Sequence, residues 1–114
     1  MQPTKEGKIS VSVMCSDLMN LERDIKQLER NGVDYLHVDV MDAHFVPNLT
    51  FGVDFIAAMH RVTKLPLDIH LMVEHPLPIM EAMDIRSGDR ISLHVELGEQ
   101  LHELAKAVRA RGAH

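Results

Sequence analysis

The stretch YLHVDVMDAHFVPN, residues 35–48, alternates strand-forming residues with charged ones. In an extended strand, His37, Asp39 and Met41 share one face because side chains alternate with a period of two, and the valines between them take the other face. An imidazole and a carboxylate side by side are costly to bury unless a partner satisfies them. The stretch therefore predicts a strand whose polar face meets a ligand or another polar group.

Segments typical of strands and helices alternate on either side of this stretch. We expect strands at 9–14, 34–41, 65–73 and 89–96, helices at 16–32, 53–62 and 99–113, and a short helix followed by a turn at 76–88. Four strand–helix units in a row predict an α/β fold with parallel strands and right-handed crossovers. The polar positions of successive strands are 27, 31 and 24 residues apart, at Ser12, Asp39, His70 and His94. This spacing suits the roughly 30 residues per unit of a (β/α)8 barrel, and it suits an open doubly wound sheet equally well.

The composition limits the class of protein. The chain of 114 residues has 46% hydrophobic residues and a formal charge of −5, and no basic patch suited to nucleic acid is present. No apolar run approaches the length of a membrane span. Cys15 is the only cysteine, which excludes an internal disulfide and fits a reducing cytoplasm, and we expect it to be an incidental residue rather than a catalytic thiol.

Polar side chains on two of the predicted strands make a candidate metal site. His37 and Asp39 share a face on one strand, and Asp68 and His70 do so on the next. Ligands of parallel α/β folds lie at the carboxyl ends of strands, where two imidazoles and a carboxylate suit Zn, Mn, Fe or Co. The alternative is a pair of hydrogen-bonded interior histidines with Asp39 bound to one of them.

Other polar and sulfur-containing residues have simpler explanations. His94 and Glu96 repeat the same spacing on the fourth predicted strand, where an outer role around the site and a structural role are both open. Methionines 14, 41 and 72 are core residues by default. The remaining histidines are expected in loops or on helix surfaces in contact with solvent: His44, His60, His75, His102 and His114.

Several motifs resemble those of the ribulose-phosphate 3-epimerases. HVDVMDAHFVPNLTFG resembles that family's signature, typically HVDVMDGHFVPN, and LPLDIHLMVEHP resembles its second signature, typically LPLDVHLMV. ISVSVMCSDLMNL is similar to the family's opening strand and helix, and ISLHVE is similar to its fourth strand. The resemblance covers nearly the whole chain after residue 8.

The resemblance implies a (β/α)8 (TIM) barrel enzyme of the pentose phosphate pathway that interconverts D-ribulose 5-phosphate and D-xylulose 5-phosphate through an enediolate. A close relative acts on D-allulose 6-phosphate. By resemblance, His37, Asp39 and His70 would bind one divalent metal ion, and Asp39 would also be a catalytic acid–base group. Ser12 and His70 would contact the phosphorylated ketose, and Met41 and Met72 would line the reaction site. A cytoplasmic homo-oligomer is expected.

The chain departs from the family pattern at two positions. Val11 replaces a proline, which we expect to change only strand stiffness, and Ala43 replaces the glycine of MDGH. The alanine matters if that position needs a positive φ, where a Cβ costs about 1 kcal/mol or more.

About half of the expected barrel is present. We expect an N-terminal tail at 1–8 and the N-terminal half of a barrel at 9–114, in which RARGAH leads into a fifth strand. By resemblance, the second catalytic aspartate lies on the seventh strand, and the phosphate-binding loops follow strands six to eight. The chain is therefore expected to be a fragment, a truncated product or a half-barrel that needs a partner. The alternatives to half of an epimerase are a non-catalytic half-barrel that self-associates through its open edges and another sugar-phosphate barrel enzyme such as a hexulose-phosphate synthase.

Overall fold

The structure, a computed structural model, describes residues 7–114. Of the tail predicted at 1–8, only Gly7 and Lys8 are among them, and neither has regular secondary structure. The strands are β1 (Ser10–Ser12), β2 (Tyr35–Asp42), β3 (Leu49–Thr50), β4 (Leu67–Met72) and β5 (Arg90–Ser92). The α-helices are α1 (Leu21–Arg30), α2 (Val53–Val62), α3 (Pro76–Ala82) and α4 (Gln100–Ala110), and the 3-10 turns are η1 (Val13–Cys15), η2 (Leu18–Asn20) and η3 (Val95–Leu97).

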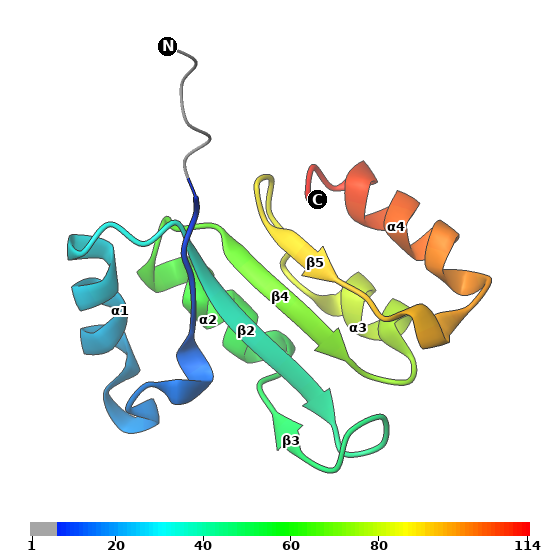
Figure 1. The fold of residues 1–114 in the computed structure, drawn as a ribbon, viewed down its shortest axis with the longest axis horizontal. Coiled ribbons are helices and arrows are strands. Elements are labelled where there is room, and N and C mark those ends of the chain that lie inside the picture. Colours follow the sequence, from blue (N-terminus) through cyan, green and yellow to red (C-terminus); the bar gives the residue numbers. More distant parts are fainter. Residues whose placement is uncertain (1–6) are drawn as a thin grey trace.

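Four strands run parallel in the order β1-β2-β4-β5, and the short β3 pairs antiparallel with the end of β2. A helix follows each parallel strand along the chain (Figure 1). Parallel neighbours require such crossover connections, so the order of elements accounts for the sheet. The predicted α/β class with a parallel sheet is confirmed.

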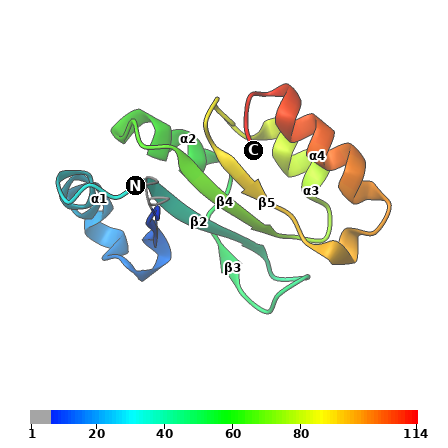
Figure 2. The same ribbon diagram turned by 45° about the horizontal axis from the view of Figure 1, so that its top comes forward.

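The hydrophobic core lies between the sheet and the helices. Helices α2, α3 and α4 lie on the same side of the sheet, and the face turned toward the viewer in Figure 1 carries no helix (Figures 1 and 2). Along β4 the side chains alternate, with Leu67, Ile69 and Leu71 fully buried. The same core includes Leu36, Val38 and Val40 of β2 and Ile56 and Met59 of α2. The polar side chains of β2 and β4 therefore point to the helix-free face.

The first unit is shorter than the sequence predicted. The strand expected at 9–14 ends at Ser12, and the helix expected from residue 16 begins at Leu21, with η2 before it. The Asp17 carboxylate accepts the Met19 N–H at 3.2 Å and so caps this 3-10 turn instead of an α-helix. The helix ends at Arg30, two residues before the predicted limit, and Gly32 has a φ of 75° just after the C-cap residue of α1.

The fourth strand also ends early. It was expected at 89–96, but β5 stops at Ser92, so His94 and Glu96 do not lie on a strand. Beyond Ser92 the pairing with β4 ends, and the chain closes the turn η3 instead. The end of the chain lies along β5, where the Ile91 N–H donates to the His114 carbonyl at 2.8 Å and the His114 N–H donates to the Asp89 carbonyl at 2.9 Å.

Within residues 7–114, none of the helices has the length and apolar character required to cross a bilayer.

Candidate metal centre

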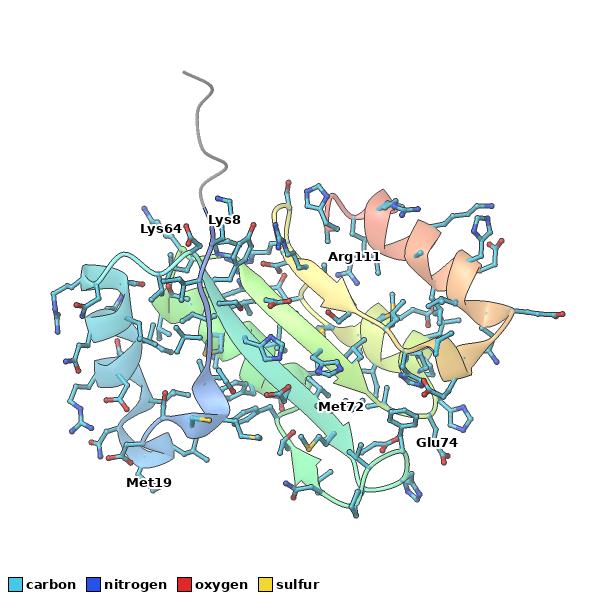
Figure 3. The ribbon with its side chains drawn as sticks, in the orientation of Figure 1. Lys8, Met19, Lys64, Met72, Glu74 and Arg111 are labelled. Atoms are coloured by element: carbon cyan, nitrogen blue, oxygen red, sulfur yellow. The ribbon has the colours of Figure 1, made fainter. Side chains whose placement is uncertain are left out.

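The site is built where β2 and β4 lie side by side. Their parallel register sets Asp39 opposite His70 and His37 opposite Asp68. Residues paired in this way point to the same face of a sheet, so the two polar rows that the sequence predicted become one patch. The patch lies on the helix-free face, and Figure 3 shows the carboxyl end of β4 at Met72, with Glu74 just beyond it.

His37, Asp39 and His70 come together on this face. Each offers one potential ligand atom, and these atoms all lie within 4.8 Å of one another. His37 Nε2 is 3.0 Å and His70 Nδ1 is 3.4 Å from Asp39 Oδ1. The side chains of His37, Asp39 and His70 are 25%, 13% and 38% exposed, so a ligand can reach them from solvent.

The donor set fits a divalent transition metal. Two imidazoles and a carboxylate are the combination found in catalytic metal sites that keep a coordination position open for substrate. The three atoms converge on an open face, and a metal ion there would neutralise the carboxylate that now contacts both imidazoles. The three side chains are therefore placed where they could hold such an ion.

Two serines and a further carboxylate surround this cluster. Ser12 Oγ donates to Asp39 Oδ2 at 3.3 Å. Asp68 Oδ2 lies 3.0 Å from His37 Nδ1 and also accepts the Ser10 hydroxyl at 2.9 Å. The polar groups therefore form a continuous row across β1, β2 and β4.

The ionisation of His37 depends on both of its carboxylate neighbours. Burial lowers the pKa of the imidazole, but its hydrogen bond to Asp68 and the charge of Asp39 outweigh burial and raise the pKa above the ordinary value. The carboxylate neighbours therefore strengthen the hold of His37 on a second proton, and this proton competes with a metal ion for a ring nitrogen.

The two methionines expected at the site lie one step further along the strands. Met41 is paired with Met72 across β2 and β4, and both are half-buried. They share the face of Asp39 and His70 because they follow them at the next alternate position. Their thioethers border the cluster toward the carboxyl ends of the strands.

Asp42 anchors the loop that follows β2. Its Oδ1 accepts the N–H groups of His44 at 2.9 Å and Phe45 at 2.8 Å, and its Oδ2 accepts that of Glu74 at 2.8 Å. Local desolvation raises the pKa of Asp42, but these three donors outweigh it and lower the pKa to about 2. The sequence analysis missed this residue, although an aspartate directly after a strand and before a turn is a recognised signal for such bonds.

The same loop contains the alanine that replaces the family's glycine. Ala43 has a φ of 61°, and its N–H donates to the Asn48 carbonyl at 2.8 Å. The backbone at this position does adopt the left-handed conformation, which is strained for a residue that has a Cβ atom. The loop is held from a second side by Phe45, whose ring stacks on His94 at 3.9 Å between centroids. His94 thus borders the site although it is not on a strand, whereas Glu96 is exposed.

One histidine was placed wrongly by the sequence analysis. His60 was expected on a solvated helix surface, but it is buried and its Nε2 lies 2.9 Å from Asp89 Oδ2. The other four histidines expected in contact with solvent are exposed: His44, His75, His102 and His114. Cys15 is also exposed and lies outside the cluster.

Comparison with known proteins gives the same family as the motifs. Residues 8–114 match the model of the "Ribulose-phosphate 3 epimerase family". The chain is 40% identical over 105 residues to "Ribulose-phosphate 3-epimerase" of Rhodobacter capsulatus, which covers 92% of this chain and 46% of the relative. The protein of the same name from Bacillus subtilis (strain 168) is 39% identical, over 92% of this chain and 48% of the relative. That from Chlamydia pneumoniae is 44% identical, over 91% of this chain and 45% of the relative.

The chain spans about half the length of these curated relatives. The family's fold is the TIM barrel, and the parallel sheet with its following helices corresponds to the first part of such a barrel. Since the family model matches almost all of the described residues, the chain belongs to the ribulose-phosphate 3-epimerase family.

Proposed function

We propose that the protein containing these residues is a metal-dependent epimerase that inverts C3 of a ketose phosphate, converting D-ribulose 5-phosphate to D-xylulose 5-phosphate through an enediolate. The observation that carries the proposal is the convergence of His37, Asp39 and His70 on the open face of the sheet, in a chain that belongs to this family. We also propose that the protein acts in the pentose phosphate pathway and in the cytoplasm. One of its relatives is named a cytoplasmic isoform, that of Oryza sativa subsp. japonica.

The proposed metal ligands are His37, Asp39 and His70, with Zn, Fe, Mn or Co as the ion. When bound, the metal supplies positive charge beside the substrate oxygens on which negative charge develops as the C3 proton leaves. The two imidazoles provide neutral donors that leave this positive charge largely uncompensated. Asp39 provides the single negative charge of the set.

Asp39 is the proposed acid–base residue for one face of the substrate. The C3–H bond breaks, its electron pair remains on the substrate, and the proton passes to the Asp39 carboxylate. A second acid on the opposite face must return a proton to C3. Asp39 serves one face only, so the family's second catalytic aspartate and its phosphate-binding loops must come from residues outside this chain.

The remaining side chains of the cluster hold the substrate. Ser12 Oγ lies within 3.3 Å of Asp39 Oδ2, so a substrate hydroxyl that approaches this carboxylate also meets Ser12. His70 is the most exposed of the three candidate ligands and can contact the same substrate. Met41 and Met72 would exclude water from the reacting carbon, because their thioethers offer no strong hydrogen bond.

The proposal assigns residues 9–114 to the N-terminal half of a (β/α)8 barrel within a homo-oligomeric enzyme. The test measures proton exchange at C3 of the substrate, catalysed by the protein as its own cells produce it. The intact mass of this protein is measured first. D-ribulose 5-phosphate is incubated in D2O, and NMR follows deuterium at C3 and the formation of D-xylulose 5-phosphate. D-allulose 6-phosphate is the comparison substrate.

We expect exchange that stops on chelation and returns with one of the four metals. Preferential turnover of D-allulose 6-phosphate would mean that the substrate is this hexose phosphate and not the proposed pentose phosphate. Absence of exchange with every metal would contradict an epimerase and favour the non-catalytic, self-associating half-barrel.

A further inference from the structure

The two ring nitrogens of His37 face two different carboxylates. Nε2 lies 3.0 Å from Asp39 Oδ1, inside the candidate ligand cluster, and Nδ1 lies 3.0 Å from Asp68 Oδ2, on the opposite side of the ring. Asp68 is brought there by the register of β4, since it is the direct partner of His37 across the sheet. Asp68 is not one of the three clustered residues.

The Asp68 carboxylate is itself held in place. Ser10 on β1 donates its hydroxyl to the same Oδ2 at 2.9 Å, so three adjacent strands contribute to one chain of contacts. This oxygen therefore has a fixed donor on one side and the His37 ring on the other. A side chain with two such contacts has little freedom to turn toward a metal ion.

We propose that Asp68 is a positioning residue that keeps the His37 proton on Nδ1 and so presents the Nε2 lone pair to the metal. A neutral imidazole carries one proton, and the nitrogen that donates it to a carboxylate cannot be the nitrogen that binds a metal. The carboxylate also raises the basicity of the ligating nitrogen and fixes the ring plane. This inference rests on the proposed metal site and adds to it a residue outside the ligand set.

The test is metal affinity rather than activity. In the protein as its cells produce it, the dissociation constant for Zn²⁺ is measured by competition with a chromophoric chelator. Asp68→Ala removes the acceptor, Asp68→Asn keeps a weaker neutral acceptor, and Asp54→Ala is the matched control on the exposed first turn of α2. We expect Asp68→Ala to weaken binding by about 10–100-fold, Asp68→Asn by less, and the control not at all.

A second measurement remains valid if Asp68→Ala fails to fold. In the zinc-loaded wild-type protein, ¹⁵N NMR of the His37 ring should show the proton on Nδ1 and none on Nε2. A proton on Nε2, or a folded Asp68→Ala variant that binds zinc as tightly as wild type, would overturn the inference and leave the proposed function intact. Wild-type protein that binds no divalent metal would overturn both.

Discussion

Two histidine–aspartate arrangements lie at different levels of the same sheet, one beside the amino ends of its strands and one in the middle of β2. His60 and Asp89 meet beside the amino ends of β4 and β5, and their side chains are only 4% and 1% exposed. His37 and Asp39 meet further toward the carboxyl ends, where the side chains are partly open to solvent. The pairs have the same chemistry and similar distances, 2.9 Å and 3.0 Å, so the surroundings determine their roles.

The hydrogen bonds around each pair explain the difference. Asp89 Oδ1 accepts the Leu67 N–H at 2.8 Å, and Asp89 Oδ2 accepts the Arg86 N–H and faces His60, both at 2.9 Å. These bonds tie the start of β4 to the turn before β5 and leave no oxygen for a ligand. In a TIM barrel, the amino ends of the strands serve stability and the carboxyl ends serve catalysis.

A cleft of about 900 Å³ beside the buried pair does not change this assignment. It lies near the amino ends and is lined by His60, Asp89, Arg86 and ten other residues. Volume alone does not make a site, and both carboxylate oxygens of Asp89 in this cleft already accept backbone N–H groups. The three clustered potential ligand atoms lie instead on the open face of β2 and β4.

Asp39→Asn is expected to have the largest effect, and it tests the proposed catalytic role of the partly exposed pair. The amide keeps the shape of the side chain but neither accepts the C3 proton nor carries the ligand charge. We expect the rate of proton exchange at C3 of the substrate to fall by about 10²–10⁴-fold while the fold persists. Deuterium incorporation and circular dichroism measure the two effects, and full activity in this variant would remove Asp39 from the mechanism.

Asp89→Ala tests the structural side. It leaves a buried imidazole and two backbone N–H groups without their acceptor, so we expect the free energy of unfolding to fall by about 3–5 kcal/mol. Urea denaturation measures the loss, and Asp54→Ala, on an exposed turn, should change it by less than about 0.5 kcal/mol. Unchanged stability together with weaker metal binding would reverse the roles assigned to the two histidine–aspartate pairs.

Ala43→Gly tests how much backbone strain is present in the loop that follows β2. A φ of 61° is costly for alanine and ordinary for glycine, but glycine also adds freedom to the unfolded chain. We expect a net gain of about 0.5–1 kcal/mol in the free energy of unfolding. The same urea experiment measures it, and a loss of stability would show that the Ala43 conformation carries little strain.

The smallest expected effect is the change in stability that follows from protonation of the Asp42 carboxylate at low pH. Its folded-state pKa of about 2 lies below the ordinary value of 3.8, so its contribution to stability is present above that value and is lost as the pH falls toward 2. We expect the stability difference between wild type and Asp42→Asn to vanish over this range. NMR titration of the carboxyl carbon measures the pKa directly, and a midpoint at or above 3.8 would show that the three N–H bonds do not hold in solution.

The local pattern of the sequence was enough to predict which side chains share a face. His37 and Asp39 are two positions apart, as are Asp68 and His70, and the alternation of a strand is a property of adjacent residues. The same reasoning located every strand–helix unit and identified Ala43 as the position where a positive φ would matter. The limits of β1 and β5 were wrong, because strand ends depend on pairing with neighbours rather than on local propensity.

The contacts between those faces were decided by the tertiary structure. The parallel register of β2 and β4 sets His70 beside Asp39 and Asp68 beside His37, and no local pattern specifies a register between strands about thirty residues apart. His60 was taken for a surface residue because its burial depends on Asp89, which is distant in sequence. The sequence by itself therefore determined the residue types and their faces, while the packing of distant segments determined which histidine–aspartate pair is closed and which is open to a ligand.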